Sequence, residues 1–264
     1  MKHALVTRSL LWVFAAVVAA LLVLPTAVVI PLSFTDKASL AFPPTGWSTR
    51  WYENFFADPT WMRALGNSLT VGLLVAIVAT VFGTAAAVGL RRWTNRRAAG
   101  ATQAVLLAPI VVPAIVLAIG VYATFLQLQL LGTVPGFVLA HSVLALPFVV
   151  ISVSATLVGY DDRLTLAALS LGASRWAAFR QVQLPLIMPG VVSGALFAFV
   201  TSFDEVVLSI FIKSPYLETL PVKMYASVTR DTDPTIAAAA TMIMLLTTAI
   251  ITIGLLSLRR RKRA

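Results

Sequence analysis

Residues 10–32 read LLWVFAAVVAALLVLPTAVVIPL, a run of 23 residues that contains no charged side chain. A helix of about 20 apolar residues is long enough to cross the hydrocarbon core of a bilayer. The run is longer than the roughly 7–15 apolar residues of a signal-peptide core, and no small-x-small cleavage site ends it. We therefore predict a membrane-spanning helix that is retained as an anchor.

Five more stretches share this length and apolarity, and they occupy residues 65–90, 101–126, 135–158, 191–212 and 235–258. Hydrophobic residues make up 59% of the chain and charged residues only 11%, whereas soluble domains carry about 25% charged residues. This composition excludes an ordinary soluble enzyme and a disordered chain. It predicts an all-α integral membrane protein, with a bundle of six transmembrane helices forming one domain over residues 1–264. Because the chain has no cysteine, it has no disulfide framework and no Cys-ligated metal site, and we predict no metal site of another kind.

The basic residues indicate which way the six spans run. An even number of spans places both termini on one side of the membrane, and fourteen of the twenty Lys and Arg residues fall on that side. Loops rich in Lys and Arg stay in the cytoplasm, so both termini are expected to be cytoplasmic. The net charge of +10 then reflects membrane topology and attraction to anionic lipid headgroups rather than binding of nucleic acid.

The stretch 191–212 is unusual because it contains two adjacent acidic residues, Asp204 and Glu205. An acidic side chain at the bilayer centre costs about 2.5–3.5 kcal/mol, so its default interpretation is a functional or paired site. Helical spacing places Thr201 on the face of Glu205, and Ser202 precedes the pair by two positions. These four residues are the candidates for a translocation path.

Simpler interpretations of the polar residues in the spans remain open. The two acids can reach headgroup water near the outer end of their span, or they can pair with Lys213 or Arg230. His141, early in the stretch 135–158, is more typical of a hydrogen-bonded structural residue than of a proton relay.

The longest internal loop, residues 159–190, contains the start and stop signals of two short helices. Asp161 or Asp162 can cap a first helix that runs to about residue 171. Gly172 suits the left-handed position that ends a helix, and Ser174 can cap a second helix that runs to about residue 183.

The end of this loop and its aromatic residues suggest how it is used. Leu184-Pro185 and Pro189-Gly190 are expected to end the second helix and to turn the chain into the next span. Trp176 and Phe179 are predicted to be exposed, and exposed aromatic side chains favour docking into the groove of a partner over a merely solvated loop.

Several residues of this loop stand at the spacing of a known motif. Ala-Ala, three residues, Gly, nine residues, Val, one residue and Leu-Pro resembles the EAA loop of ABC importer permeases, with Leu166 at the position of the glutamate of that family and Val182 at that of its isoleucine. The resemblance implies the type I permease fold and a coupling helix that contacts a separate ATPase. The residues that it assigns to this ATPase-coupling loop are Leu166, Ala167, Ala168, Gly172, Ala173, Ser174, Trp176, Phe179, Val182, Leu184 and Pro185.

Three further stretches, SFDE at 202–205, TLP at 219–221 and PTIAA at 234–238, are similar to the second permease of spermidine/putrescine-type importers. This resemblance implies a multi-pass protein of the bacterial inner membrane. It also implies a heterodimer with a second permease subunit, two ATPase subunits and a periplasmic substrate-binding protein. ATP and Mg²⁺ would bind the partner ATPase, and no cofactor would bind this chain, which has no Gly-x-x-x-x-Gly-Lys-[Ser/Thr] loop.

The resemblance thus implies a permease subunit, itself not an enzyme, that imports a small amine such as a polyamine. Alternatives within the same class are opines, aminophosphonates and amino-acid-like solutes. A self-contained carrier is less supported because the chain shows no internal repeat. An intramembrane enzyme is less supported because the two histidines, His3 and His141, form no recognisable catalytic constellation in the sequence.

Overall fold

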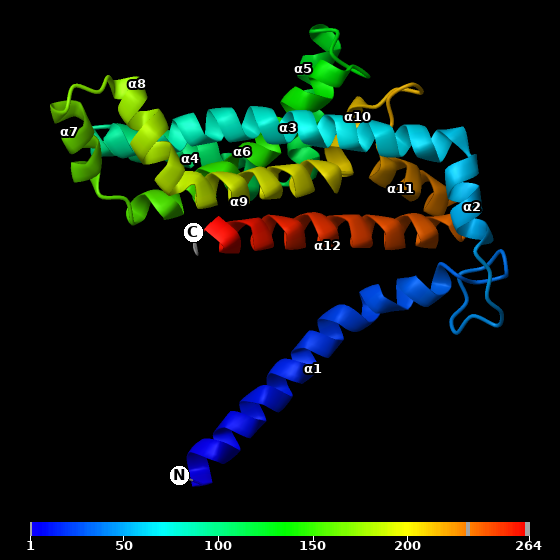
Figure 1. Cartoon of the computed structure of the whole chain (residues 1–264). Helices are drawn as coiled ribbons and strands as arrows, with labels where there is room; N and C mark the ends of the chain where they lie inside the picture. The colour runs from blue at the N-terminus through cyan, green and yellow to red at the C-terminus, as the bar shows by residue number, and fades with distance from the viewer. Residues whose placement is uncertain (1, 231–232, 262–264) are drawn as a thin grey trace. The chain divides into compact units, whose positions relative to one another are not determined.

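The structure is a computed structural model that describes residues 2–230 and 233–261, and these residues form helices joined by loops, with no β-strand among them (Figure 1). In chain order the helices are α1 (Lys2–Leu32), α2 (Arg50–Ala57), α3 (Pro59–Arg92), α4 (Arg96–Val111), α5 (Ala114–Gln127), α6 (Val134–Val158), α7 (Asp162–Ser170), α8 (Arg175–Ala178), the π-helix η1 (Phe179–Gln183), α9 (Leu184–Phe203), α10 (Val207–Ile212), α11 (Leu220–Arg230) and α12 (Thr235–Arg261).

Among the described residues, five helical stretches are long and apolar enough to cross a membrane. They are Leu10–Leu32, Pro59–Arg92, Val134–Val158, Arg175–Phe203 and Thr235–Gly254. A sixth span results if α4 and α5 count as one broken span. The helices predicted at 10–32, 65–90, 135–158 and 235–258 are therefore confirmed, whereas the other two predicted spans need correction.

The span predicted at 101–126 is not one continuous helix. The axes of α4 and α5 differ by 103°, and the break lies at Val112 and Pro113. Pro113 has no backbone N–H, and the residue before a proline is driven out of the α region. Val112 accordingly has an extended ψ of 129°, so α4 stops before it.

The span predicted at 191–212 is also broken, because residues 204–206 form a turn between α9 and α10. The carboxylate of Glu205 accepts hydrogen bonds from the backbone amides of Leu208 and Ser209, each at 2.9 Å. A side-chain acceptor that satisfies the free amides of a first turn starts a new helix. The chain therefore restarts at α10 instead of continuing α9.

The chain divides into two compact units, Met1–Met62 with Met224–Leu246 and Arg63–Lys223 with Thr247–Ala264. In the first unit, Phe55 of α2 and Trp61 of α3 are buried, with ring centroids 5.7 Å apart. Asp233 caps α12 by accepting a hydrogen bond from the amide of Thr235 at 3.0 Å. Asn54 of α2 donates to the hydroxyl of Thr235 at 2.8 Å, and this bond fastens α2 to the first turn of α12.

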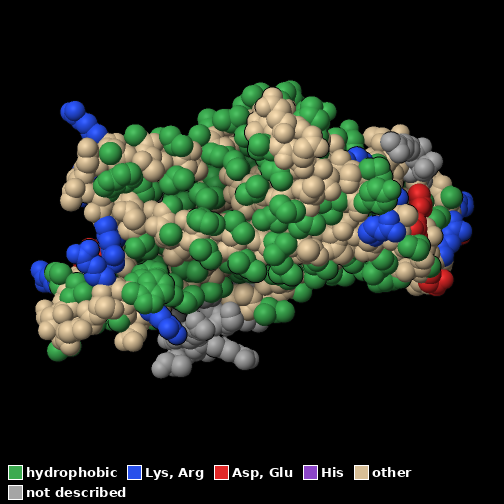
Figure 2. All heavy atoms as spheres, turned by 90° about the horizontal axis from the view of Figure 1, so that it is seen from above, with side chains coloured by type: hydrophobic (Ala, Val, Ile, Leu, Met, Phe, Trp, Pro, Cys, Tyr) green, Lys and Arg blue, Asp and Glu red, His purple; other side chains and the backbone are tan. Residues whose placement is uncertain are grey.

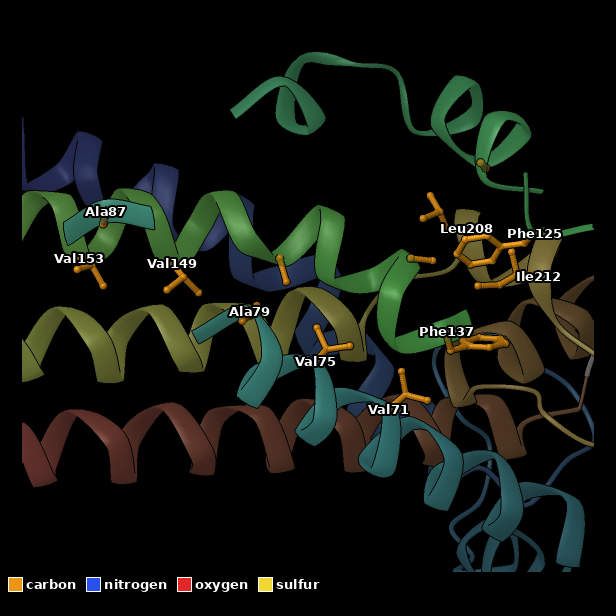
Figure 3. Close-up of a cluster of buried hydrophobic side chains, with 14 of the residues drawn as sticks. Val71, Val75, Ala79, Ala87, Phe125, Phe137, Val149, Val153, Leu208 and Ile212 are labelled. Atoms are coloured by element: carbon orange, nitrogen blue, oxygen red, sulfur yellow. The ribbon is translucent and has the colours of Figure 1, made fainter. Parts of the chain in front are cut away.

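The core of the second unit contains side chains from α3, α5, α6, α9 and α10, and Figure 3 labels ten of its residues, from α3, α5, α6 and α10. Val75 of α3, Val149 of α6 and Ala198 of α9 are fully buried in this cluster. Membrane helices approach closely where their residues are small. A Cβ atom on Gly190 of α9 would lie 2.7 Å from the carbonyl oxygen of Ser152 in α6, so only glycine lets α9 cross α6 at this distance.

Much of the outer surface is apolar. On α3, for example, the side chains of Ile77 and Phe82 are 61% and 62% exposed. Figure 2 shows hydrophobic side chains over most of the visible face, with Lys and Arg gathered towards its two ends. An apolar surface of this extent requires lipid or protein neighbours, as the sequence composition predicts.

Candidate functional site

The chain between α6 and α9 folds into α7 and α8–η1, which together we call the hairpin (residues 161–183). The side chains of Asp161 and Ser174 accept hydrogen bonds from amides in the helical turns that follow them, at 2.9 and 3.1 Å. Gly172, between the two helices, has a φ of +87°, in the left-handed region that other residues rarely adopt. The two predicted caps and the predicted glycine turn are confirmed.

The predicted end of the second helix at residues 184–190 is wrong. η1 continues directly into α9, and Arg175–Phe203 forms one uninterrupted helical stretch. Pro185 lies at the start of α9, directly after the wider i→i+5 turn of η1, and Pro189 lies inside α9 as prolines in membrane helices can. The second half of the hairpin is therefore joined to α9 by a continuous helix.

The hairpin presents apolar side chains outward. Leu171 is 89% exposed, Trp176 68% and Leu166 61%. The ring of Trp176 lies 5.4 Å from that of Phe179, and Phe179 is half-buried rather than exposed as predicted. Of the other predicted coupling residues, Ala167, Gly172, Ser174 and Pro185 are exposed and Ala168, Ala173, Val182 and Leu184 are half-buried. Large apolar groups held outward by a capped hairpin are suited to burial against a partner protein.

The second candidate site is the acidic turn, residues 204–206. The side chain of Glu205 is only 8% exposed because its carboxylate caps α10. Asp204 is exposed, and among the described residues its carboxylate has no hydrogen-bond or ion-pair partner. Lys213 does not neutralise either acid, since its Nζ donates to Glu218 at 2.6 Å. The side chain of Arg230, the other suggested partner, lies outside the described residues.

His141 of α6 joins this turn to the helix bundle. Its Nδ1 lies 2.9 Å from the hydroxyl of Ser202, and its Nε2 lies 3.0 Å from the hydroxyl of Ser209. The same Nε2 is 3.7 Å from Oε2 of Glu205. His141 and Ser209 are fully buried and Ser202 is nearly so. The imidazole therefore fastens the last turn of α9 and the first turn of α10 to α6.

The sequence does not reveal this cluster or its pairing of serine with histidine. The two serines lie 61 and 68 residues from His141 in the chain, so no local spacing indicates the contact. The one available signal was that an imidazole in an apolar span needs a hydrogen-bonding partner. Because the imidazole and both hydroxyls are buried, the cluster is suited to positioning the acidic turn and exposes no nucleophile.

The structure thus separates the four residues predicted for the translocation path. Ser202 is bound to His141, Glu205 caps α10, Thr201 is half-buried on α9, and Asp204 is exposed. Among the described residues, no group of three or more His, Cys, Asp and Glu side chains is placed to hold a metal ion. Of these four residues, Asp204 alone has a side chain that is exposed and left free to bind a ligand.

Residues 79–264 match the family model described as "Binding-protein-dependent transport system inner membrane component". The chain is 34% identical over 248 residues to the spermidine/putrescine transport system permease protein PotC of Haemophilus influenzae, covering 94% of this chain and 95% of that protein. It is 33% identical over 226 residues to the putrescine transport system permease protein PotI of Escherichia coli K12, covering 83% of this chain and 80% of that protein.

The fold is shared with transporters of known structure. A chain of a bacterial ABC transporter involved in the import of the acidic polysaccharide alginate superposes with a TM-score of 0.75, at 16% identity, over 98% of this chain and 96% of that chain. A chain of an amino acid ABC transporter gives a TM-score of 0.58 at 17% identity, over 80% of this chain and 98% of that chain. The predicted all-α permease fold is confirmed. This chain belongs to the family of binding-protein-dependent transport system inner membrane components, which are transport permeases and not enzymes.

Proposed function

We propose that this permease forms the path for a polyamine together with a second permease subunit, in an importer that has two ATPase subunits and a periplasmic binding protein. The relatives named for spermidine and putrescine support this cargo. The observation that carries the proposal is Asp204, an exposed carboxylate in an unwound turn of an otherwise apolar span. A flexible polycation that leaves water needs such a carboxylate to offset the cost of desolvation.

The hairpin is the part of this chain that receives the motion of the ATPase. ATP, bound with Mg²⁺ by the partner ATPase, supplies the free energy of transport. Trp176, Leu166 and Leu171 bury their apolar side chains in a groove of that partner. Because α8, η1 and α9 form one helical stretch, a push on the hairpin moves α9 along its length.

Asp204 stands at the end of α9 that lies farthest from the hairpin along the chain. A helix with the length of α9 spans roughly 30 Å, so the hairpin and the acidic turn lie near opposite ends of one rigid element. His141 and Glu205 keep the turn in a defined conformation while α9 shifts. Asp204 binds an ammonium group of the cargo in one position of α9 and releases it when α9 moves.

The test is uptake of radiolabelled spermidine and putrescine into liposomes that contain this chain with its partner ATPase, second permease and binding protein. Asp204→Asn is expected to lower uptake roughly tenfold, since hydrogen bonds to charged groups contribute about 1.5–3 kcal/mol. Asp36→Asn, which changes another exposed aspartate, serves as the matched control and is expected to leave uptake unchanged. Uptake without the ATPase would contradict ATP-driven import, and ATP hydrolysis stimulated only by neutral or anionic solutes would contradict the cargo.

A further inference from the structure

We propose that Arg91 and Arg92, the last two residues of α3, form a clamp that fastens α3 on both sides of the hairpin, to the end of α6 and to the last residue of η1. The inference rests on the proposed ATP-driven import, in which the hairpin is displaced. The hairpin is joined through the chain to α6 and α9, but α3 has no such connection to it. The clamp makes the end of α3 move together with α6 and α9.

Arg91 holds the end of α6 and the residue just before the hairpin. Its Nη1 donates to the carbonyl oxygen of Leu157 in the last turn of α6, and its Nη2 donates to the carbonyl oxygen of Tyr160 at 2.7 Å. The last carbonyls of a helix lack partners within that helix, so Arg91 caps α6 from a neighbouring helix. Nη2 also lies 2.8 Å from the carboxylate of Asp162, but that side chain is 67% exposed, and exposed ion pairs contribute little. The two carbonyls therefore carry this half of the clamp.

Arg92 holds the side of the hairpin where the chain leaves. Its Nη2 donates to Oε1 of Gln183 at 2.8 Å. Gln183 is the last residue of η1 and only 1% exposed. A buried amide oxygen cannot exchange its partner for water without cost, so this hydrogen bond is retained as the hairpin moves. Consecutive helical residues point about 100° apart, which lets one arginine reach α6 and its neighbour reach η1.

Open clefts flank the last turn of α3, where the polar contacts of Arg91 and Arg92 lie. Three cavities of about 390, 290 and 320 Å³ adjoin this end of the helix. Arg92 lines the first two cavities, and Arg91 lines the third. Farther along α3, Val75 is fully buried in the core. Core packing extends along α3 as far as Ala87, which is 2% exposed, and the two arginines hold the last turn beyond it.

The alternative is that both arginines serve only as cationic anchors for lipid headgroups. Arg97 of α4 provides the matched control, because it is exposed and its side chain makes no hydrogen bond to another described residue. A headgroup anchor requires only a positive charge, so lysine would substitute for it. Arg91 requires the forked guanidinium, because its Nη1 and Nη2 bind the carbonyl oxygens of two different residues, and lysine does not provide this fork.

The first test measures polyamine uptake per ATP hydrolysed by the reconstituted transporter. Arg91→Ala and Arg92→Ala are each expected to lower this ratio roughly fivefold, a typical coupling between sites, while the ATPase still co-purifies. Arg91→Lys is expected to behave like Arg91→Ala, and Arg97→Ala like the unsubstituted chain. Full rescue by lysine, or an equal loss in Arg97→Ala, would overturn the clamp in favour of a charge effect.

The second test does not depend on transport. Because the chain has no cysteine, spin labels can be attached at Thr94→Cys, just beyond α3, and at Ser170→Cys on the hairpin; both positions are exposed. In the assembled transporter the distance between the labels is expected to stay narrowly distributed with and without ATP, and to broaden in the Arg91→Ala/Arg92→Ala variant. A distribution that the double substitution leaves unchanged would overturn the clamp. An unsubstituted transporter that neither hydrolyses ATP nor moves polyamines would overturn the proposed function instead.

Discussion

At the scale of single residues, Asp204 and Glu205 carry the same charge in adjacent positions and occupy opposite environments. The carboxylate of Glu205 turns inward, where it accepts two backbone amides and lies 3.7 Å from His141. Asp204 faces outward from the same turn. A buried charge must be compensated by hydrogen bonds, and the free amides of α10 supply that compensation to Glu205 alone.

This difference predicts that Glu205→Gln affects stability rather than cargo recognition. Glutamine is neutral and retains one side-chain oxygen acceptor, so one α10 amide loses its acceptor and the other keeps only an uncharged one. Hydrogen bonds to charged groups contribute about 1.5–3 kcal/mol. We expect a lower unfolding temperature in detergent and an unchanged KM for spermidine, measured beside Asp204→Asn. A raised KM at unchanged unfolding temperature would show instead that Glu205 contacts the cargo.

At the scale of secondary-structure elements, the hairpin is specified locally and its junction with α9 is not. The caps at Asp161 and Ser174 and the turn at Gly172 are each formed by residues within a few positions of one another. The junction departs from the prediction because η1 and the first turn of α9 accommodate Pro185, and because Gly190 is used for close approach to α6 rather than for a turn. The consequence is a rigid connection from the hairpin to the membrane.

The hairpin turn can be tested by comparing Gly172→Val with Gly89→Val. Neither glycine has a heavy atom within 4 Å of an added Cβ, but only Gly172 has a positive φ. The left-handed conformation costs a residue with a Cβ about 1–2 kcal/mol of conformational energy, and it costs a β-branched residue more. We expect Gly172→Val to lose ATPase co-purification or coupled uptake with its spans still inserted, as judged by protease protection, and Gly89→Val to retain both. Normal coupled uptake by Gly172→Val would refute a role for this turn.

At the scale of the whole molecule, the distribution of Lys and Arg predicts the orientation in the membrane. The structure does not describe the side chains of the basic residues at the two termini. The connection between α3 and α4 is described, and it carries four arginines: Arg91 and Arg92 end α3, and Arg96 and Arg97 begin α4. A positively charged loop resists translocation across the membrane, so the prediction places the hairpin, the end of α3 and both termini on the cytoplasmic side.

Topology reporters check this orientation directly. Green fluorescent protein fused to the C-terminus is expected to fluoresce, because it folds on the cytoplasmic side. Alkaline phosphatase fused after Tyr216, an exposed residue between α10 and α11, is expected to be active on the outer side. The opposite pattern, with an inactive phosphatase and no fluorescence, would reverse the assigned orientation and with it the access of the hairpin to an ATPase.

The amino-acid sequence by itself determined the features that depend on neighbouring residues. Apolar runs of sufficient length specified the spans, and capping side chains with a glycine specified the hairpin, because these interactions act within a turn or two of helix. The same local rules did not predict that the span at 191–212 divides at the acidic turn, and they wrongly ended the second helix of the hairpin at residues 184–190.

Only the tertiary structure decided which acid is free, where α9 ends and how α3 is held. Each of these depends on groups far apart in the chain: His141 meets Ser202 and Ser209, and Arg92 meets Gln183 across 91 positions. Hydrogen bonds between buried groups form only after the helices pack, and they then select one local conformation among several that the sequence permits. For that physical reason the roles of Asp204 and Glu205 could not be separated by their spacing.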